Sequence, residues 1–236
     1  MHRLFISDLH LSEETPKIEA ALTHLLAEEQ PDSLVILGDL FEAWVGDDDD
    51  APLANRLREL LYRTSQRGCE IAIARGNRDF MLGQRFATDV GASLLEDETL
   101  MTISGKPTIV LHGDTLCTDD RDYQQFRAMV HDTGWQAEMM ARGLAERREL
   151  AQQLRALSID AASNKPEDIM DVNGEAVSAL MTESGATLMI HGHTHRPDRH
   201  VLPAGERIVL GDWNDTSGWL LRERGETLTL ERFIIH

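Results

Sequence analysis

The chain has 236 residues, enough for one α/β domain with a sizeable core. Its formal net charge of −18 argues against nucleic acid as the main partner, because phosphate backbones bind positively charged grooves. No apolar run approaches the ~18 residues of a membrane span, and the start, MHRLFISDLH, does not resemble a secretory signal. We therefore expect a soluble or peripheral cytoplasmic protein with no obligate protein partner.

Short apolar, β-branched runs alternate with amphipathic segments along the chain. The runs predict strands over 2–7, 33–38, 70–75, 107–112, 187–191 and 206–211. Helical periodicity predicts helices over 16–29, 51–67 and 174–184. Two hairpins are expected, one joining 100–104 to 107–112 and one joining 217–222 to 227–233. This order predicts a single layered α/β domain with a mixed sheet or two packed sheets.

The stretch 121–162 reads as helical throughout and differs in charge from the rest of the chain. Residues 121–165 carry seven basic and six acidic side chains, so this segment is close to neutral in an acidic protein. We interpret 121–165 as a helical insertion that covers the strand ends and can approach an anionic surface or ligand. Ordinary connecting helices are an equally compatible alternative.

Seven potential metal ligands follow the predicted strands. They are Asp8, His10, Asp39, Asn77, His112, His193 and His195. Side chains two apart on an extended segment point the same way, so Asp8 should converge with His10, and His193 with His195. Carboxylate, amide and imidazole groups without cysteine suit Mn²⁺, Fe²⁺ or Zn²⁺. The set predicts a two-metal hydrolytic centre in which Asp39 bridges the ions.

Two further features surround these ligands. Glycine precedes Asp39 and Asn77 and follows His112, which permits tight turns and a close approach of the backbone. The acidic run 47–50 is expected to be a solvated loop, with a supporting role near the metals as the less favoured alternative.

The ordered pattern D-x-H, G-D, G-N, H-G and G-H-x-H resembles the calcineurin-like metallophosphoesterase superfamily over nearly the whole chain. The resemblance implies a β-sandwich flanked by helices, with metals at the strand ends. It also implies in-line attack of water on phosphorus without a covalent enzyme intermediate. By this resemblance Asp8, His10, Asp39 and His195 would bind one ion, and Asp39, Asn77, His112 and His193 the other.

One position narrows the choice of phosphoester. Many superfamily members have G-N-H followed by an acid, whereas this chain has Gly76-Asn77-Arg78-Asp79. Arginine is a poor general acid, but its planar fork suits phosphoryl oxygens. A leaving phosphate, with a second pKa of about 6, needs little protonation. Arg78 therefore favours a pyrophosphate substrate; alternatively, it only binds phosphate and another group supplies the acid.

Longer motifs sharpen the resemblance. They are FEAWVGDD (41–48), GNRDF (76–80), HGDTLCTDDRDYQQFR (112–127), IMDVN (169–173) and IHGHTHRP (190–197). Together they are similar to the UDP-2,3-diacylglucosamine diphosphatase family of lipid A biosynthesis, which forms 2,3-diacylglucosamine 1-phosphate (lipid X) and UMP. That resemblance implies two Mn²⁺ ions, peripheral attachment to the cytoplasmic face of the inner membrane, and a helical insertion that acts as a lid on the acyl chains.

The same resemblance implies substrate contacts at Asn77, Arg78, Asp120, Ser158, Lys165 and His193. The family often has a polar residue at the position of Ala162, which leaves that contact in doubt or supplied by Asn164. Apolar candidates for acyl-chain contacts are Phe126, Trp135, Met139, Met140 and Leu144. Two other functions remain open: a nucleotide phosphodiesterase or nuclease with the same metals, and a non-catalytic scaffold with a vestigial metal fold.

Overall fold

The computed structural model describes residues 1–163 and 169–236, and its first sheet has six strands. These are β1 (His2–Ile6), β2 (Ser33–Leu37), β3 (Glu70–Ala74), β4 (Ala92–Leu94), β10 (Ser217–Arg224) and β11 (Thr227–Ile234). Their order is β11-β10-β1-β2-β3-β4. Strands β1 to β4 are parallel, and the β10–β11 hairpin extends the sheet antiparallel to β1.

The second sheet has five strands in the order β5-β6-β7-β9-β8. Their bounds are β5 (Glu98–Ile103), β6 (Lys106–Leu111), β7 (Leu188–His191), β8 (Asp198–Leu202) and β9 (Gly205–Val209). Strands β6, β7 and β9 run parallel, and β5 and β8 pair antiparallel at the two edges.

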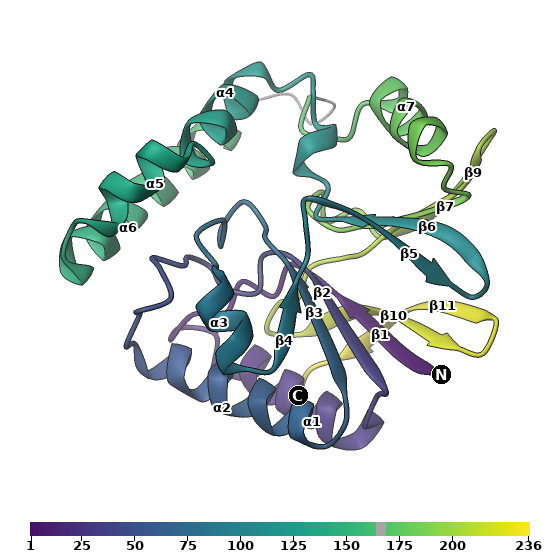
Figure 1. Cartoon of the computed structure of the whole chain (residues 1–236), viewed down its shortest axis with the longest axis horizontal. Helices are drawn as coiled ribbons and strands as arrows, with labels where there is room; N and C mark the ends of the chain where they lie inside the picture. Colours follow the sequence, from purple (N-terminus) through teal and green to yellow (C-terminus); the bar gives the residue numbers. More distant parts are fainter. Residues whose placement is uncertain (164–168) are drawn as a thin grey trace.

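The two sheets pack face to face, and helices cover their outer faces. Phe5 and Val35 of the first sheet share a buried cluster with Val110 and Ile190 of the second. The alternate residues of β1 and β2 point the other way, because successive strand side chains face opposite sides. They pack against α1 (Pro16–Glu29), α2 (Pro52–Gln66) and α3 (Gln84–Asp89). Helix α7 (Gly174–Ser184) covers the second sheet (Figure 1).

This arrangement confirms the expected α/β class and the sandwich of two sheets flanked by helices. Three short elements, β4, β8 and α3, lie where the sequence predicts no strand or helix. β4 and α3 have only 3 and 6 residues, which is too short for hydrophobic periodicity to distinguish them from loops, and the five residues of β8 are mostly polar and exposed, so they form no apolar run.

The helical insertion is mostly helical, as the sequence predicts, and contains three separate helices. They are α4 (Arg121–Val130), α5 (Thr133–Met140) and α6 (Leu144–Ser163). Asp120 caps α4 by accepting a hydrogen bond from the Tyr123 amide at 3.0 Å, and Asp132 caps α5 through the Trp135 amide at 2.9 Å. Figure 1 shows the three helices extending away from the sandwich at one end of the molecule. Within the described residues, no helix is both long and apolar enough to cross a bilayer.

The acidic run 47–50 is only partly the solvated loop that the sequence predicts, because Asp48 and Asp50 are exposed but all four carboxylates have partners. Asp47 accepts hydrogen bonds from the amides of Gly83 and Phe86 at the start of α3, at 2.9 and 3.0 Å. Asp48 binds Arg147 of α6, with Nη1 and Oδ1 2.8 Å apart. Arg148 pairs with both Asp49 and Asp50. The run therefore attaches the helical insertion to the core, because each charge has a partner that is distant in sequence.

Candidate metal centre

The predicted metal ligands gather at one edge, where parallel strands of both sheets end. Asp8 and His10 follow β1, Asp39 follows β2, Asn77 follows β3, His112 follows β6, and His193 and His195 follow β7. Backbone hydrogen bonds hold these loops together, from the His10 amide to the Asp39 carbonyl at 3.0 Å and from the Gly192 amide to the His112 carbonyl at 2.8 Å. The topology thus brings residues from both ends of the chain to one place.

Most of these ligands have a left-handed backbone, which the sequence reasoning missed. Positive φ angles occur at Asp8 (56°), His10 (49°), Asp39 (52°), His193 (67°) and His195 (55°). Non-glycine residues adopt this conformation at a cost, and it is concentrated at functional sites. The expectation that strand alternation orients Asp8 with His10 is therefore wrong. Both residues lie beyond the end of β1 at Ile6, and the left-handed turns direct them inward.

One group of donor atoms comes from Asp8, His10 and His195. His195 Nε2 lies 3.3 Å from Asp8 Oδ1 and 3.3 Å from His10 Nε2. Asp39 Oδ2 is 3.8 Å from His10 Nδ1. Asp8, His10 and His195 offer donor atoms close enough to share one cation, and Asp39 lies beside His10.

A second group surrounds His112. Asn77 Oδ1 lies 2.9 Å from both His112 Nε2 and His193 Nδ1. Asp39 Oδ2 also lies 3.8 Å from His112 Nε2, and Asp8, Asp39 and His112 offer donor atoms close enough to share a cation. Asp39 Oδ2 thus lies between His10 and His112. This central position is the one a bridging ligand needs.

The donor set fits divalent cations. Asp8 Oδ1 is buried and accepts no hydrogen bond from the described residues, which leaves a carboxylate oxygen available to a cation. His112 Nδ1 donates to the Leu37 carbonyl at 2.9 Å, leaving Nε2 as the metal-facing nitrogen. Oxygen and imidazole donors without sulfur suit transition ions of intermediate hardness.

The pKa values of the buried groups follow from the same crowding. Burial and the nearby His112 lower the pKa of His193 to about 3, so its imidazole is neutral, as a metal ligand must be. Burial would lower the pKa of His112, but the carboxylates of Asp39, Asp8 and Asp114 raise it to about 9. Carboxylates that favour a proton on His112 also favour a metal cation at this place.

Glycine is required where the loops meet. A Cβ on Gly76 would overlap the Asp39 side chain, and one on Gly192 would overlap Asp8 Oδ2 and Ser7. Gly38, before Asp39, has a φ of +85° and lies against His112 and Gly76. The predicted role of glycine before Asp39 and Asn77 is therefore confirmed, and Gly192 adds a position that the sequence reasoning did not single out.

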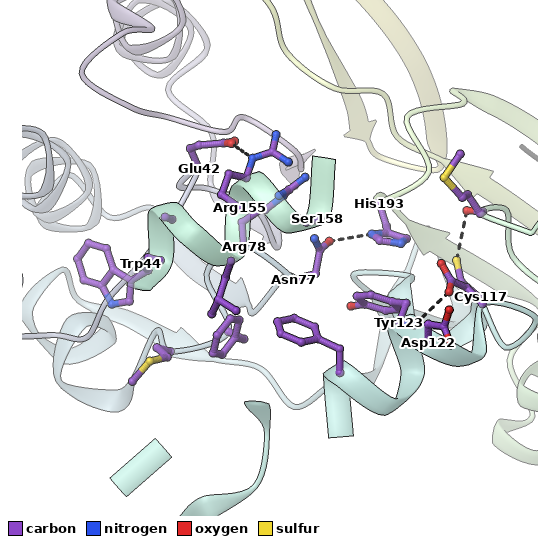
Figure 2. A pocket seen from close by; sticks show the side chains of 18 of the residues that line it. Glu42, Trp44, Asn77, Arg78, Cys117, Asp122, Tyr123, Arg155, Ser158 and His193 are labelled. Atoms are coloured by element: carbon purple, nitrogen blue, oxygen red, sulfur yellow. Dashed lines mark hydrogen bonds and ion pairs between the residues drawn. The ribbon is translucent and has the colours of Figure 1, made fainter. Parts of the chain in front are cut away.

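A cavity of about 580 Å³ opens beside the ligands and lies under the helical insertion. Figure 2 shows Asn77 and His193 on its inner wall with Arg78 nearby. The rest of the lining is mainly apolar, contributed by Trp44, Val45, Phe80, Met81, Phe126, Trp135, Met139 and Leu154. Arg78 Nε is buried without a hydrogen-bond partner in the described part of the chain, so its guanidinium has donor capacity left for a ligand.

The cavity collects most of the predicted substrate contacts, whose roles stay predictions. Asn77, Arg78, Asp120, Ser158 and His193 all line it. Lys165 and Asn164 lie outside the described residues. Of the apolar candidates, Phe126, Trp135 and Met139 line the cavity, whereas Met140 and Leu144 do not.

Several polar lining residues were not singled out from the sequence, among them Glu42, Tyr123 and Arg155. Glu42 and Tyr123 stand inside the motifs 41–48 and 112–127, which was the available signal. Arg155 stands in the helical insertion with no motif around it.

Comparisons with known proteins agree with this geometry. The sequence model described as calcineurin-like phosphoesterase matches residues 1–197. Relatives named UDP-2,3-diacylglucosamine hydrolase include one from Cellvibrio japonicus, 46% identical over all of both chains. Another, from Escherichia coli O6:H1, is 44% identical over 99% of both chains.

Solved structures share the fold at low sequence identity. An archaeal phosphodiesterase has a TM-score of 0.52 at 13% identity, covering 99% of both chains. A hypothetical protein from Pyrococcus horikoshii OT3 has a TM-score of 0.53 at 10% identity, covering 100% of this chain and 88% of that one. The chain therefore belongs to the calcineurin-like phosphoesterase family and, within it, to the family of UDP-2,3-diacylglucosamine hydrolases.

Proposed function

We propose that this chain hydrolyses the pyrophosphate bond of UDP-2,3-diacylglucosamine, giving 2,3-diacylglucosamine 1-phosphate and UMP. The observation that carries the proposal is the junction at Asn77 and Arg78, where the metal donor set meets a cavity with a mainly apolar lining. A substrate with acyl chains on one side of a pyrophosphate matches that division of polar and apolar surface. The names of the full-length relatives point to the same substrate.

The chain's own residues would bind and orient the pyrophosphate. Divalent ions held by the donor set would neutralise charge and would lower the pKa of a bound water. Arg78 is buried, which lowers the pKa of its guanidinium, but arginine stays charged at neutral pH and can hold phosphoryl oxygens with its fork. No general acid is needed for a sugar 1-phosphate leaving group, whose second pKa is about 6. This chemistry suits water attack on the α-phosphorus of the UDP group.

Two Mn²⁺ ions are the proposed cofactors. Asp39 faces both groups of donors, which supports two ions per chain with one shared ligand. Carboxylate, amide and imidazole donors are compatible with Mn²⁺. Metal analysis of the purified chain, followed by activity after Asp39→Ala, tests this. If the Asp39→Ala variant still hydrolysed the substrate, the proposal that Asp39 holds two ions would be wrong.

The proposed location is the cytoplasmic face of the inner membrane, as a peripheral protein. Met129 and Met140 of the helical insertion are exposed, 45% and 43% respectively, and Arg142 is exposed beside Met140. Apolar side chains next to a cation suit the surface of an anionic membrane. Sedimentation with phosphatidylglycerol vesicles tests the contact. Met129→Ser/Met140→Ser should reduce binding, and unchanged binding would contradict this assignment of the surface.

Phosphorus NMR of the reaction in ¹⁸O-water tests the proposed activity. The proposal expects the ¹⁸O label in UMP, because water attacks the α-phosphorus. Label in 2,3-diacylglucosamine 1-phosphate would show that water attacks the β-phosphorus instead. Faster turnover of bis(p-nitrophenyl)phosphate than of UDP-2,3-diacylglucosamine would instead indicate a general phosphodiesterase.

A further inference from the structure

Glu42 stands between the metal ligands and the helical insertion. Its carboxylate Oε2 lies 3.3 Å from His10 Nδ1, and Oε1 accepts a hydrogen bond from Nε of Arg155 on α6. Figure 2 shows the pair of Glu42 and Arg155 at the rim of the pocket beside Arg78. One carboxylate therefore faces a metal ligand and a residue of the insertion at the same time.

The backbone fixes the position of Glu42 relative to His10. The Glu42 amide donates to the Leu11 carbonyl at 3.0 Å, and the Leu11 amide donates to the Leu40 carbonyl at 3.0 Å. The segment that carries Glu42 thus runs beside the segment that carries His10. Because both backbones are paired, the facing of Glu42 and His10 does not depend on a flexible loop.

The two nitrogens of His10 have different surroundings. Nε2 faces His195 Nε2 within the donor group, while Nδ1 faces the carboxylates of Glu42 and Asp39 at 3.3 and 3.8 Å. A histidine that binds metal through one nitrogen commonly donates its other N–H to a carboxylate, which fixes the ring and strengthens the ligand. Glu42 has the charge and the place for that partner.

We propose that Glu42 is a positioning residue that orients His10 for the cation shared with Asp8, Asp39 and His195. Through its ion pair with Glu42, Arg155 couples the orientation of His10 to the docking of α6 on the core. The proposal rests on the metal centre of the proposed function. Binding of a cation at His10 would favour the docked insertion, and a docked insertion would favour that cation, because coupling between two sites is reciprocal. The fold and the set of metal ligands do not by themselves imply that the helical insertion affects metal binding.

Mn²⁺ titration of the apo protein tests the proposal, with free Mn²⁺ read by EPR. The wild type should show two binding steps. Glu42→Ala should weaken one step by roughly 10–100-fold, the usual effect of losing such a partner, and leave the other step unchanged. Glu42→Gln should weaken it less, because an amide oxygen at the same place can accept a hydrogen bond from His10 Nδ1 once the ring is oriented by the cation. Glu59→Ala, which removes an exposed carboxylate paired with Arg63 on α2, is the matched control and should bind as the wild type does.

Two arginine variants test the coupling. Arg155→Ala should weaken the same step, by less than Glu42→Ala does, and should speed amide hydrogen exchange in α6. Arg148→Ala breaks a different ion pair of α6, with Asp49 and Asp50, and leaves the Glu42–Arg155 pair in place, so it should weaken Mn²⁺ binding less than Arg155→Ala does. Unaltered Mn²⁺ binding in Glu42→Ala would overturn the role of Glu42, as would equal weakening of both steps. Unaltered Mn²⁺ binding in Arg155→Ala would overturn the coupling. Both readouts use the chain and Mn²⁺ alone, so failure to hydrolyse UDP-2,3-diacylglucosamine would count only against the proposed substrate.

Discussion

The buried carboxylate of Asp79 holds the loop that presents Asp39. Asp79 Oδ1 accepts hydrogen bonds from the amides of Asp39 at 3.2 Å and Gly76 at 2.7 Å, and Oδ2 accepts from those of Leu40 at 2.8 Å and Phe41 at 3.3 Å. Four donors on one carboxylate offset much of the cost of its burial. They also fix the left-handed backbone of Asp39, which places the shared carboxylate between both groups of ligands.

Replacing Asp79 by asparagine should lower both stability and activity. The new NH₂ group would face two backbone amides in place of an acceptor, so two hydrogen bonds to a charged group are lost. We expect a decrease of about 3 kcal/mol in the free energy of unfolding, measured by urea denaturation in EDTA. Asp32→Asn is the control, because Asp32 caps only the exposed His2 amide, and it should change stability by about 0.5 kcal/mol or less. Equal effects of the two substitutions would contradict this role of Asp79.

Arg78→Ala should abolish most turnover while metal binding is retained. The guanidinium is a partly buried cation at the junction of metal centre and cavity, and Arg78 is not among the candidate ligands. Loss of one such stabilising group typically costs about 10²–10³-fold in kcat. Arg78→Lys should recover part of that loss, because it restores the charge without the planar fork. Steady-state kinetics with metal analysis checks this prediction. An unchanged kcat in Arg78→Ala would contradict a role of Arg78 in turnover.

Gly192→Ala should disturb the metal centre. The added methyl would overlap Asp8 Oδ2, which accepts a hydrogen bond from the His193 amide at 3.0 Å. We expect Mn²⁺ affinity to fall by roughly 10-fold or more, as for lost support of a ligand. Gly143→Ala is a matched control, since a Cβ there meets nothing within 4 Å. If calorimetric titration gave the same affinity for both variants, the close packing at Gly192 would be irrelevant to metal binding.

Substrates without acyl chains should be poor. The apolar lining of the cavity supplies binding energy remote from the phosphates, and such energy can be used to position the reacting group. We therefore expect UDP-glucosamine to be hydrolysed with a kcat/KM at least 100-fold below that of the diacylated substrate. Comparable values for the two would remove the argument that the cavity holds acyl chains.

The sequence predicts the strand ends well, because a buried strand has a strong local signature, and the candidate ligands that follow those strands come together in the structure. Asp8, Asp39 and His112 each follow such a run, and their types alone indicate metal chemistry. The left-handed turns were not predictable in the same way, since Asp8 and His10 have no glycine-like signature. Contacts between distant residues also leave no local trace. Arg147 meets Asp48 across 99 residues, and Arg155 meets Glu42 across 113. The attachment of the helical insertion therefore required the structure.

The arrangement of two cations around Asp39 is the claim on which the account depends. Crystals grown with Mn²⁺ and measured at the manganese absorption edge test it directly. We expect two anomalous peaks on either side of the Asp39 carboxylate, one near Asp8, His10 and His195 and the other near Asn77, His112 and His193. A single peak, or peaks that Asp39 does not contact, would contradict it.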